Sequence, residues 1–169
     1  PSLRGNTRSR TVDSLVEEAW RLAAGGVKEL NLVAQDLTEY GMEKRYNDMT
    51  LAKLLPALCH IDGIEWIRLF YAYPDQFPNE VIDIMTAESK IVKYLDMPIQ
   101  HTSDRILKLM NRRVSRSEIF EFVEKLRKKI PGIYLRTSVI AGFPSETEEE
   151  FAQLKADLEQ LHFEHLGAF

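Results

Sequence analysis

Polar side chains that can bind a ligand gather where apolar, strand-like segments of this 169-residue chain end. Gln35 and Asp36 close one such segment and Gln100 closes another. Arg136 lies within a further segment between apolar neighbours, where a charged side chain needs a partner. That partner is either a ligand carboxylate or an aspartate of the chain itself. Gln35 and Asp36 suit an amine or hydroxyl ligand, with a turn capped by Asp36 as the alternative.

A glycine–proline turn follows the Arg136 segment. Gly142 permits close approach of the backbone to a ligand, and Pro144 restricts the direction of the chain. The helix pattern that comes next begins with several glutamates, which repel a phosphate from the positive end of a helix. The pattern therefore favours a ligand held by its base or sugar over one held by phosphates.

The sequence predicts no metal site. His101 has no second His or Cys nearby at metal-ligand spacing, which argues against zinc. Cys59 is the single cysteine, so an internal disulfide framework is excluded and a reducing cytoplasm is favoured. Because Leu54, Leu55 and Leu58 precede Cys59 at helical spacing, we interpret Cys59 as a small buried apolar residue.

The elements that position these residues alternate between helix and strand. Four strand-like segments each follow an amphipathic helix pattern: Leu30–Asp36, Trp66–Pro74, Val92–His101 and Tyr134–Pro144. A fifth strand begins near Phe163. Such alternation is typical of parallel sheets, in which the carboxyl ends of the strands converge on one face. The fold class is therefore α/β, most of a barrel-like sheet without closure into an eight-fold barrel.

Helix boundaries are predicted from capping patterns. Ser14–Glu17, Ser115–Glu118 and Ser145–Glu148 each have the spacing of a capping box. Pro56 falls inside a helix pattern and is expected to kink that helix or to restrict it to a loose turn. The polar segment 37–48 is expected to be a loop.

Composition is that of an ordinary globular domain, with 44% apolar and 28% charged residues. No apolar run is long enough to span a membrane. The net charge of −4 argues against nucleic-acid binding by the whole surface. Arg4, Arg8 and Arg10 form a basic arm, either a solvated tail or an RNA contact. Both ends look cut, so we expect a piece of a larger protein.

Five strings of residues occur here in the same order as in the radical S-adenosylmethionine (SAM) methylthiotransferases, and the chain resembles that family over essentially its whole length. They are Arg4–Arg10; Ala34-Gln-Asp36 with Tyr40-Gly41; Arg68–Pro74; Pro98-Ile-Gln-His-Thr-Ser-Asp104 with Met110-Asn-Arg112; and Ile140–Thr147. Each string alone is weak, but the joint match is specific.

The resemblance implies a partial (β/α)6 barrel of the TIM type, here truncated, and SAM as cofactor. Gln35 and Asp36 would lie near the methionine amino group of SAM, and Gln100 and Arg136 near its ribose and carboxylate. The segment Ile140–Pro144, with Gly142 and Phe143, would lie near the adenine.

The family also uses [4Fe-4S] clusters, and the cysteine loop that binds the radical-generating cluster has no counterpart in this sequence. Residues 1–169 would then be a barrel core without that loop and without the flanking domains. The cluster ligands are absent from this chain, which alone should be inactive.

Within the family, Ala-Gln-Asp and Pro-Ile-Gln-His resemble the RimO branch, which adds a methylthio group to the β-carbon of an aspartate in a small-subunit ribosomal protein. The implied partner is that protein or the ribosome, with a possible RNA contact, in the cytoplasm and without a membrane. A MiaB-like enzyme acting on tRNA adenosine is the nearest alternative. A barrel lyase or aldolase without a cluster, and a non-catalytic binding fragment, are more distant ones.

Overall fold

A computed structural model describes residues 8–42 and 50–169, except for the side chain of Gln76. Arg4 and residues 43–48 of the expected loop lie outside the described residues. The helices and strands follow in the order α1 (Val12–Ala24), β1 (Glu29–Leu32), η1 (Leu37–Glu39), α2 (Leu51–Cys59), β2 (Trp66–Leu69), η2 (Pro74–Gln76), α3 (Asn79–Ala87), β3 (Ile91–Asp96), α4 (Asp104–Leu109), α5 (Arg116–Lys129), β4 (Tyr134–Val139), α6 (Glu148–Leu161) and β5 (His165–Ala168).

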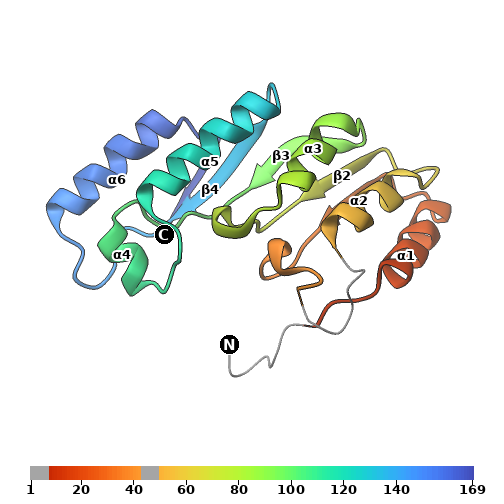
Figure 1. Cartoon of the computed structure of the whole chain (residues 1–169), viewed down its shortest axis with the longest axis horizontal. Coiled ribbons are helices and arrows are strands. Elements are labelled where there is room, and N and C mark those ends of the chain that lie inside the picture. Colours follow the sequence, from red (N-terminus) through yellow and green to blue (C-terminus); the bar gives the residue numbers. More distant parts are fainter. Residues whose placement is uncertain (1–7, 43–49) are drawn as a thin grey trace.

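The five strands form one parallel sheet in the order β1-β2-β3-β4-β5. The helices succeed one another along it from α1 at one end to α6 at the other (Figure 1). Each strand therefore pairs with the next strand of the chain, as βα repeats require. Within the described residues β1 and β5 are the sheet edges, so the expected α/β partial barrel is confirmed.

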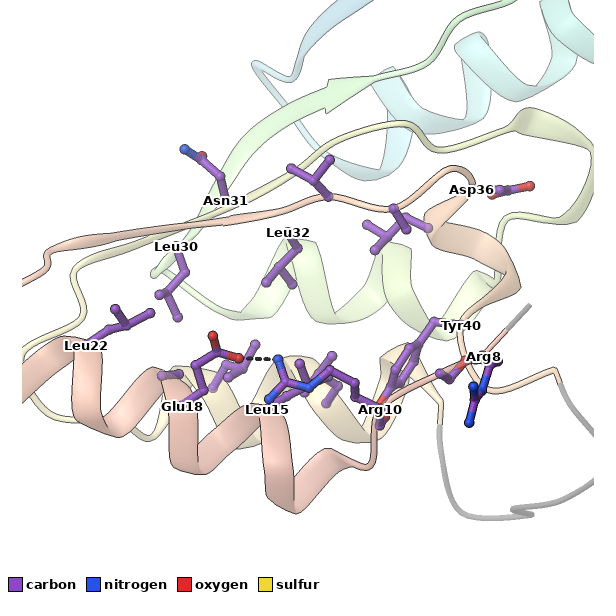
Figure 2. Close-up of a pocket in the computed structure, with 17 residues that line it drawn as sticks. Arg8, Arg10, Leu15, Glu18, Leu22, Leu30, Asn31, Leu32, Asp36 and Tyr40 are labelled. Carbon is purple, nitrogen blue, oxygen red and sulfur yellow. Dashed lines mark hydrogen bonds and ion pairs between the residues drawn. The ribbon is translucent and has the colours of Figure 1, made fainter. Parts of the chain in front are cut away.

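The two faces of the sheet differ in burial. Leu30, Leu69 and Leu135 are buried on the face that the helices cover. Their strand neighbours Asn31 and Arg136 point the other way, because side chains alternate along a strand. Figure 2 shows this for β1, where Leu30 and Leu32 point toward the helices and Asn31 points away from them. The uncovered face is thus free to carry polar side chains.

Helix starts agree with the expected capping boxes in one case of three. The Ser115–Glu118 box of α5 is confirmed. In α1, Thr11 rather than Ser14 is the N-cap. In α6 the box is Thr147–Glu150, because Ser145 has a left-handed backbone (φ 74°) and belongs to the preceding turn.

Two further expectations were wrong in part. Pro56 lies within α2, a single helix from Leu51 to Cys59, so the proline does not restrict this segment to a loose turn. The expected loop after β1 begins with the 3-10 helix η1, whose Leu37 and Thr38 are buried. No helix of the described residues is long and apolar enough to cross a membrane.

Candidate functional site

Strands β3 and β4 bring an aspartate and an arginine together on the uncovered face. Asp96 and Arg136 are register partners, and Arg136 Nη1 donates to Asp96 Oδ1 at 2.7 Å. The Asp96 side chain is 1% exposed, whereas that of Arg136 is 39% exposed. Asp96 Oδ2 is buried without a hydrogen-bond partner among the described residues. The ion pair that the sequence suggested as one of two possible roles of Arg136 therefore exists. Its partner Asp96 orients the half-exposed guanidinium of Arg136.

The charge of Arg136 is secured by this arrangement. The hydrogen bond to Asp96 raises the pKa of Arg136 above its ordinary value. Among the described residues Arg136 donates through Nη1 to Asp96, and the other guanidinium nitrogens keep donors for a further partner. A guanidinium with unused donors suits a carboxylate ligand, which can accept two parallel hydrogen bonds.

Aromatic and charged side chains of β2 and β3 continue the same face. Arg68 lies over the Tyr94 ring, 5.0 Å from its centroid, and the Phe70 and Tyr94 ring centroids are 5.7 Å apart. Arg68 Nε donates to Glu29 Oε1 at 2.7 Å. Burial raises the pKa of Tyr94, with a smaller rise from Asp96. The face therefore offers flat apolar surface beside fixed charges.

Gln100 joins the chain after β3 to the end of β4. Its N–H donates to Ser138 O at 2.9 Å, and its carbonyl accepts from Ile140 N at 2.8 Å. Its backbone is left-handed (φ 69°), which is uncommon for a residue with a side chain. Such strain persists only where the surroundings impose it, and it occurs often at ligand sites. Gln100 and Ile140 are both half-buried and adjacent, as a common site requires.

The turn after β4 contains the remaining expected residues. Gly142 has a positive φ of 74°, and a Cβ added there would meet no atom of the chain within 4 Å. Phe143 is half-buried beside it. The N–H groups of Gly142 and Phe143 donate to Glu146 Oε2 at 2.6 and 2.9 Å. Gly142 is thus required by the turn and also borders open space.

Gln35 and Asp36 lie apart from these residues, because they follow β1, which is separated from β3 by β2. Gln35 is exposed. Asp36 caps η1, and its Oδ1 accepts from the Thr38 N–H at 2.8 Å. Burial raises the pKa of Asp36, and the hydrogen bonds from Thr38 oppose that rise. The capping role of Asp36, expected as the alternative to ligand binding, is therefore present. A ligand that touches Asp36 as well as the residues at the ends of β3 and β4 must extend across the sheet.

A cavity of about 370 Å³ lies between α1, α2 and β1 (Figure 2). Its walls are mainly apolar, with Leu22, Leu30 and Leu32 among them, and Arg10 pairs with Glu18 at its rim. Asp36 is the one residue of the expected site that lines it. Because the other expected residues do not line this cavity, we place the candidate site on the uncovered face, at the ends of β3 and β4.

The described residues hold no group of three or more His, Cys, Asp and Glu side chains that could bind a metal ion. Cys59 is buried in α2, and burial raises the pKa of its thiol to about 11. The expected apolar role of Cys59 is confirmed. One protonated, buried thiol cannot supply the three thiolates that an iron–sulfur cluster takes from a cysteine loop.

The basic arm and the tyrosines that follow β2 make contacts within the chain. In the basic arm Arg10 pairs with Glu18 of α1, and Arg8 is exposed. Tyr71 is exposed and half-buried Tyr73 lies under Arg112, whose guanidinium carbon is 4.5 Å from the ring centroid.

Sequence reasoning missed Asp96 and the pairing of His101 with Glu146. Asp96 carries the same signal that identified Arg136, a charge inside an apolar strand. His101 is fully buried, and its Nε2 lies 3.3 Å from Glu146 Oε1. No spacing rule links positions 101 and 146, so only the fold reveals that contact.

The sequence matches the family described as the Radical SAM superfamily over residues 1–158. A protein of Lachnoclostridium phytofermentans named ribosomal protein uS12 methylthiotransferase RimO is 52% identical over 169 residues, all of this chain and 38% of that protein. One of the same name from Geotalea uraniireducens is 51% identical over the same shares. The chain thus spans well under half the length of these relatives.

Solved structures share the fold at low identity. A radical SAM methyltransferase, TsrM of Kitasatospora setae, superposes with a TM-score of 0.73 at 19% identity, over 94% of this chain and 30% of that one. Coproporphyrinogen III oxidase (HemN) of Escherichia coli gives 0.59 at 18% identity, over 94% and 37%. At such identities the likeness concerns the fold alone.

Proposed function

This chain belongs to the radical SAM superfamily, and we propose that it is the barrel part of a methylthiotransferase that modifies ribosomal protein uS12. The observation that carries the proposal is the similarity to proteins of that name along the entire chain, at 52% and 51% identity. Such a protein would act in the cytoplasm, where ribosomes are assembled.

The residues at the strand ends fit SAM as a ligand. Within the described part of the chain Arg136 keeps donors that a carboxylate could use, and a Cβ at Gly142 would meet no atom within 4 Å, which leaves room for a flat ring beside the backbone. In this proposal Arg136 binds the methionine carboxylate, Gln100 contacts the ribose, and Ile140, Gly142 and Phe143 border the adenine. Gln35 and Asp36 approach the methionine amino group from the β1 side. Bound SAM would supply the methyl group that is transferred.

The residues of this chain do not fit a [4Fe-4S] cluster. Cys59 is its one cysteine and lies buried within α2, away from the strand ends. The clusters of the intact protein would therefore depend on cysteines outside these 169 residues.

The proposed acceptor is an aspartate of uS12, modified at its β-carbon. The uncovered face of the sheet is the surface of this chain that such a substrate would approach, because the proposed SAM site opens onto it. The arginines of that face, Arg68 and Arg136, are already partnered by Glu29 and Asp96. A substrate carboxylate would thus approach two arginines whose charges are largely balanced by Glu29 and Asp96.

The test is modification of uS12 by the intact protein. The full-length enzyme, purified anaerobically with its clusters, is incubated with SAM, sulfide, a reductant and either ribosomes or uS12, and peptides are analysed by mass spectrometry. We expect one methylthio group on one aspartate. Unmodified uS12 together with methylthiolated adenosine in a parallel reaction with tRNA would contradict the proposal and favour the tRNA-modifying alternative.

A further inference from the structure

A fully buried histidine, His101, lies behind the turn that follows β4 without belonging to the proposed ligand contacts. It follows Gln100 after β3 and is 0% exposed. The Ser103 N–H donates to His101 Nδ1 at 2.8 Å. Because Nδ1 accepts, the proton of the neutral ring resides on Nε2. Nε2 is therefore fixed as a donor, and it is directed at Glu146 Oε1, 3.3 Å away.

The Glu146 carboxylate uses its two oxygens for different partners. Oε1 faces His101, whereas Oε2 accepts from the N–H groups of Gly142 and Phe143. Its side chain is only 4% exposed. The Glu146 N–H donates in turn to Phe143 O at 2.8 Å. One buried carboxylate thus fixes the Gly142 and Phe143 N–H groups, and His101 contacts the other oxygen of that carboxylate.

We propose that His101 is a positioning residue, which through Glu146 holds the Gly142–Phe143 turn in the conformation that receives the nucleoside part of the ligand. This inference rests on the proposed function, since the ligand is SAM. His101 touches no ligand itself. Its role follows from the direction of its Nε2–H and from the fact that Gly142, at the far end of the chain of contacts, borders open space.

A second link between neighbouring parts of the chain provides a matched control. Arg105 of α4 donates to Glu150 Oε2 of α6 at 2.5 Å and to the Ser145 carbonyl at 2.6 Å. Like the His101 link, it connects the chain after β3 with the chain after β4, but it touches neither the Gly142 N–H nor the Phe143 N–H. A role limited to holding the loops together would be shared by both links.

The experiment compares His101→Leu, His101→Gln and Arg105→Met in the intact, cluster-loaded protein. Leu removes the donor to Glu146, whereas the Gln amide restores one at similar reach. SAM affinity is measured by anaerobic calorimetry, normalised to folded protein. Hydrogen–deuterium exchange of the peptide containing Gly142 and Phe143 is measured without SAM.

We expect His101→Leu to raise the Kd for SAM at least tenfold and to speed exchange of the turn. His101→Gln should recover most of the affinity, and Arg105→Met should leave both readouts unchanged. Glu146→Gln serves if His101→Leu does not fold. Its amide nitrogen must face either the His101 Nε2–H or the two backbone N–H groups, so it too should weaken binding.

Unchanged affinity in His101→Leu or Glu146→Gln would overturn the inference, as would an equal loss in Arg105→Met. Failure of the wild-type protein to bind SAM would instead refute the proposed function. The two failures are therefore distinguishable.

Discussion

Gly142 has two proposed roles, one in the backbone conformation of the turn after β4 and one in binding the ligand. Its φ of 74° favours glycine, and its missing Cβ leaves open space toward the proposed adenine position. Gly132, in the turn before β4, has nearly the same φ of 75° and the same open surroundings. It lies at the opposite end of β4 and so provides a matched control.

Gly142→Ala and Gly132→Ala should each lower the free energy of unfolding by about 1–2 kcal/mol, because alanine disfavours the left-handed region. Only Gly142→Ala should weaken SAM binding by the folded intact protein, by about tenfold or ~1.4 kcal/mol. Chemical denaturation and calorimetry measure the two effects. Equal SAM affinities in both variants would remove Gly142 from the site.

The thiol of Cys59 should be inert in the native protein. Burial raises its pKa to about 11, so almost no thiolate exists at pH 8. We expect iodoacetamide to label Cys59 only after denaturation, and anaerobic iron–sulfide reconstitution of the 169-residue chain to yield no cluster. Rapid native labelling, or a stoichiometric [4Fe-4S] absorption band, would contradict this assignment.

At the residue scale, Arg136 and Gln100 were identifiable from sequence because each interrupts or ends an apolar strand. Asp96 carried the same signal. The His101–Glu146 contact could not be predicted, since its partners come from loops 45 positions apart that are joined only by the packing of β3 against β4. Likewise, the sequence could not decide between the ligand and turn roles of Asp36, because its Oδ1 serves a local cap.

At the scale of elements, the position at which α6 begins determines which residues can form the turn before it. Two overlapping patterns, Ser145–Glu148 and Thr147–Glu150, both have capping-box spacing. The structure uses the second, which leaves residues 142–146 free to form the turn held by Glu146. The alternation of helix and strand could be predicted from the hydrophobic pattern of each segment. The exact N-cap of α6 could not, because two capping patterns overlap there.

Thr147→Ala should therefore destabilise the protein by about 1 kcal/mol, the usual cost of losing an N-cap side chain. Ser145→Ala should change stability much less, because Ser145 precedes the cap and its hydroxyl only accepts an exposed contact from Arg105. Urea denaturation midpoints measure both. A larger loss for Ser145→Ala would show that the helix begins earlier.

The contact between Arg105 of α4 and Glu150 of α6 should respond to acid. Hydrogen bonds from Arg105 and Ser103 lower the pKa of Glu150 to about 2. A depressed pKa means that this stabilisation is present above the ordinary value of 4.5 and is lost as the pH falls toward 2. The stability difference between wild type and Glu150→Gln should thus shrink across that interval. A difference independent of pH would contradict the contact.

At the scale of the whole molecule, five parallel strands and the helices that alternate with them leave one face of the sheet uncovered, and the candidate site residues lie near the carboxyl-terminal ends of its strands. The fold class was predictable because each repeat carries its own pattern. The extent of the site was not, since it depends on how far β1 lies from β3 and β4. Arg136 on β4 and Asp36 after β1 are separated by β2 and β3, and the amino and carboxylate groups of SAM share one carbon atom, so both side chains must reach toward the methionine end of the ligand.

A crystal structure of the intact protein with SAM tests this account most directly. The SAM carboxylate should lie within hydrogen-bonding distance of Arg136, with the adenine against Ile140, Gly142 and Phe143 and the amino group directed toward Gln35 and Asp36. SAM in the cavity between α1 and β1, or SAM remote from an Arg136 that pairs only with Asp96, would contradict it.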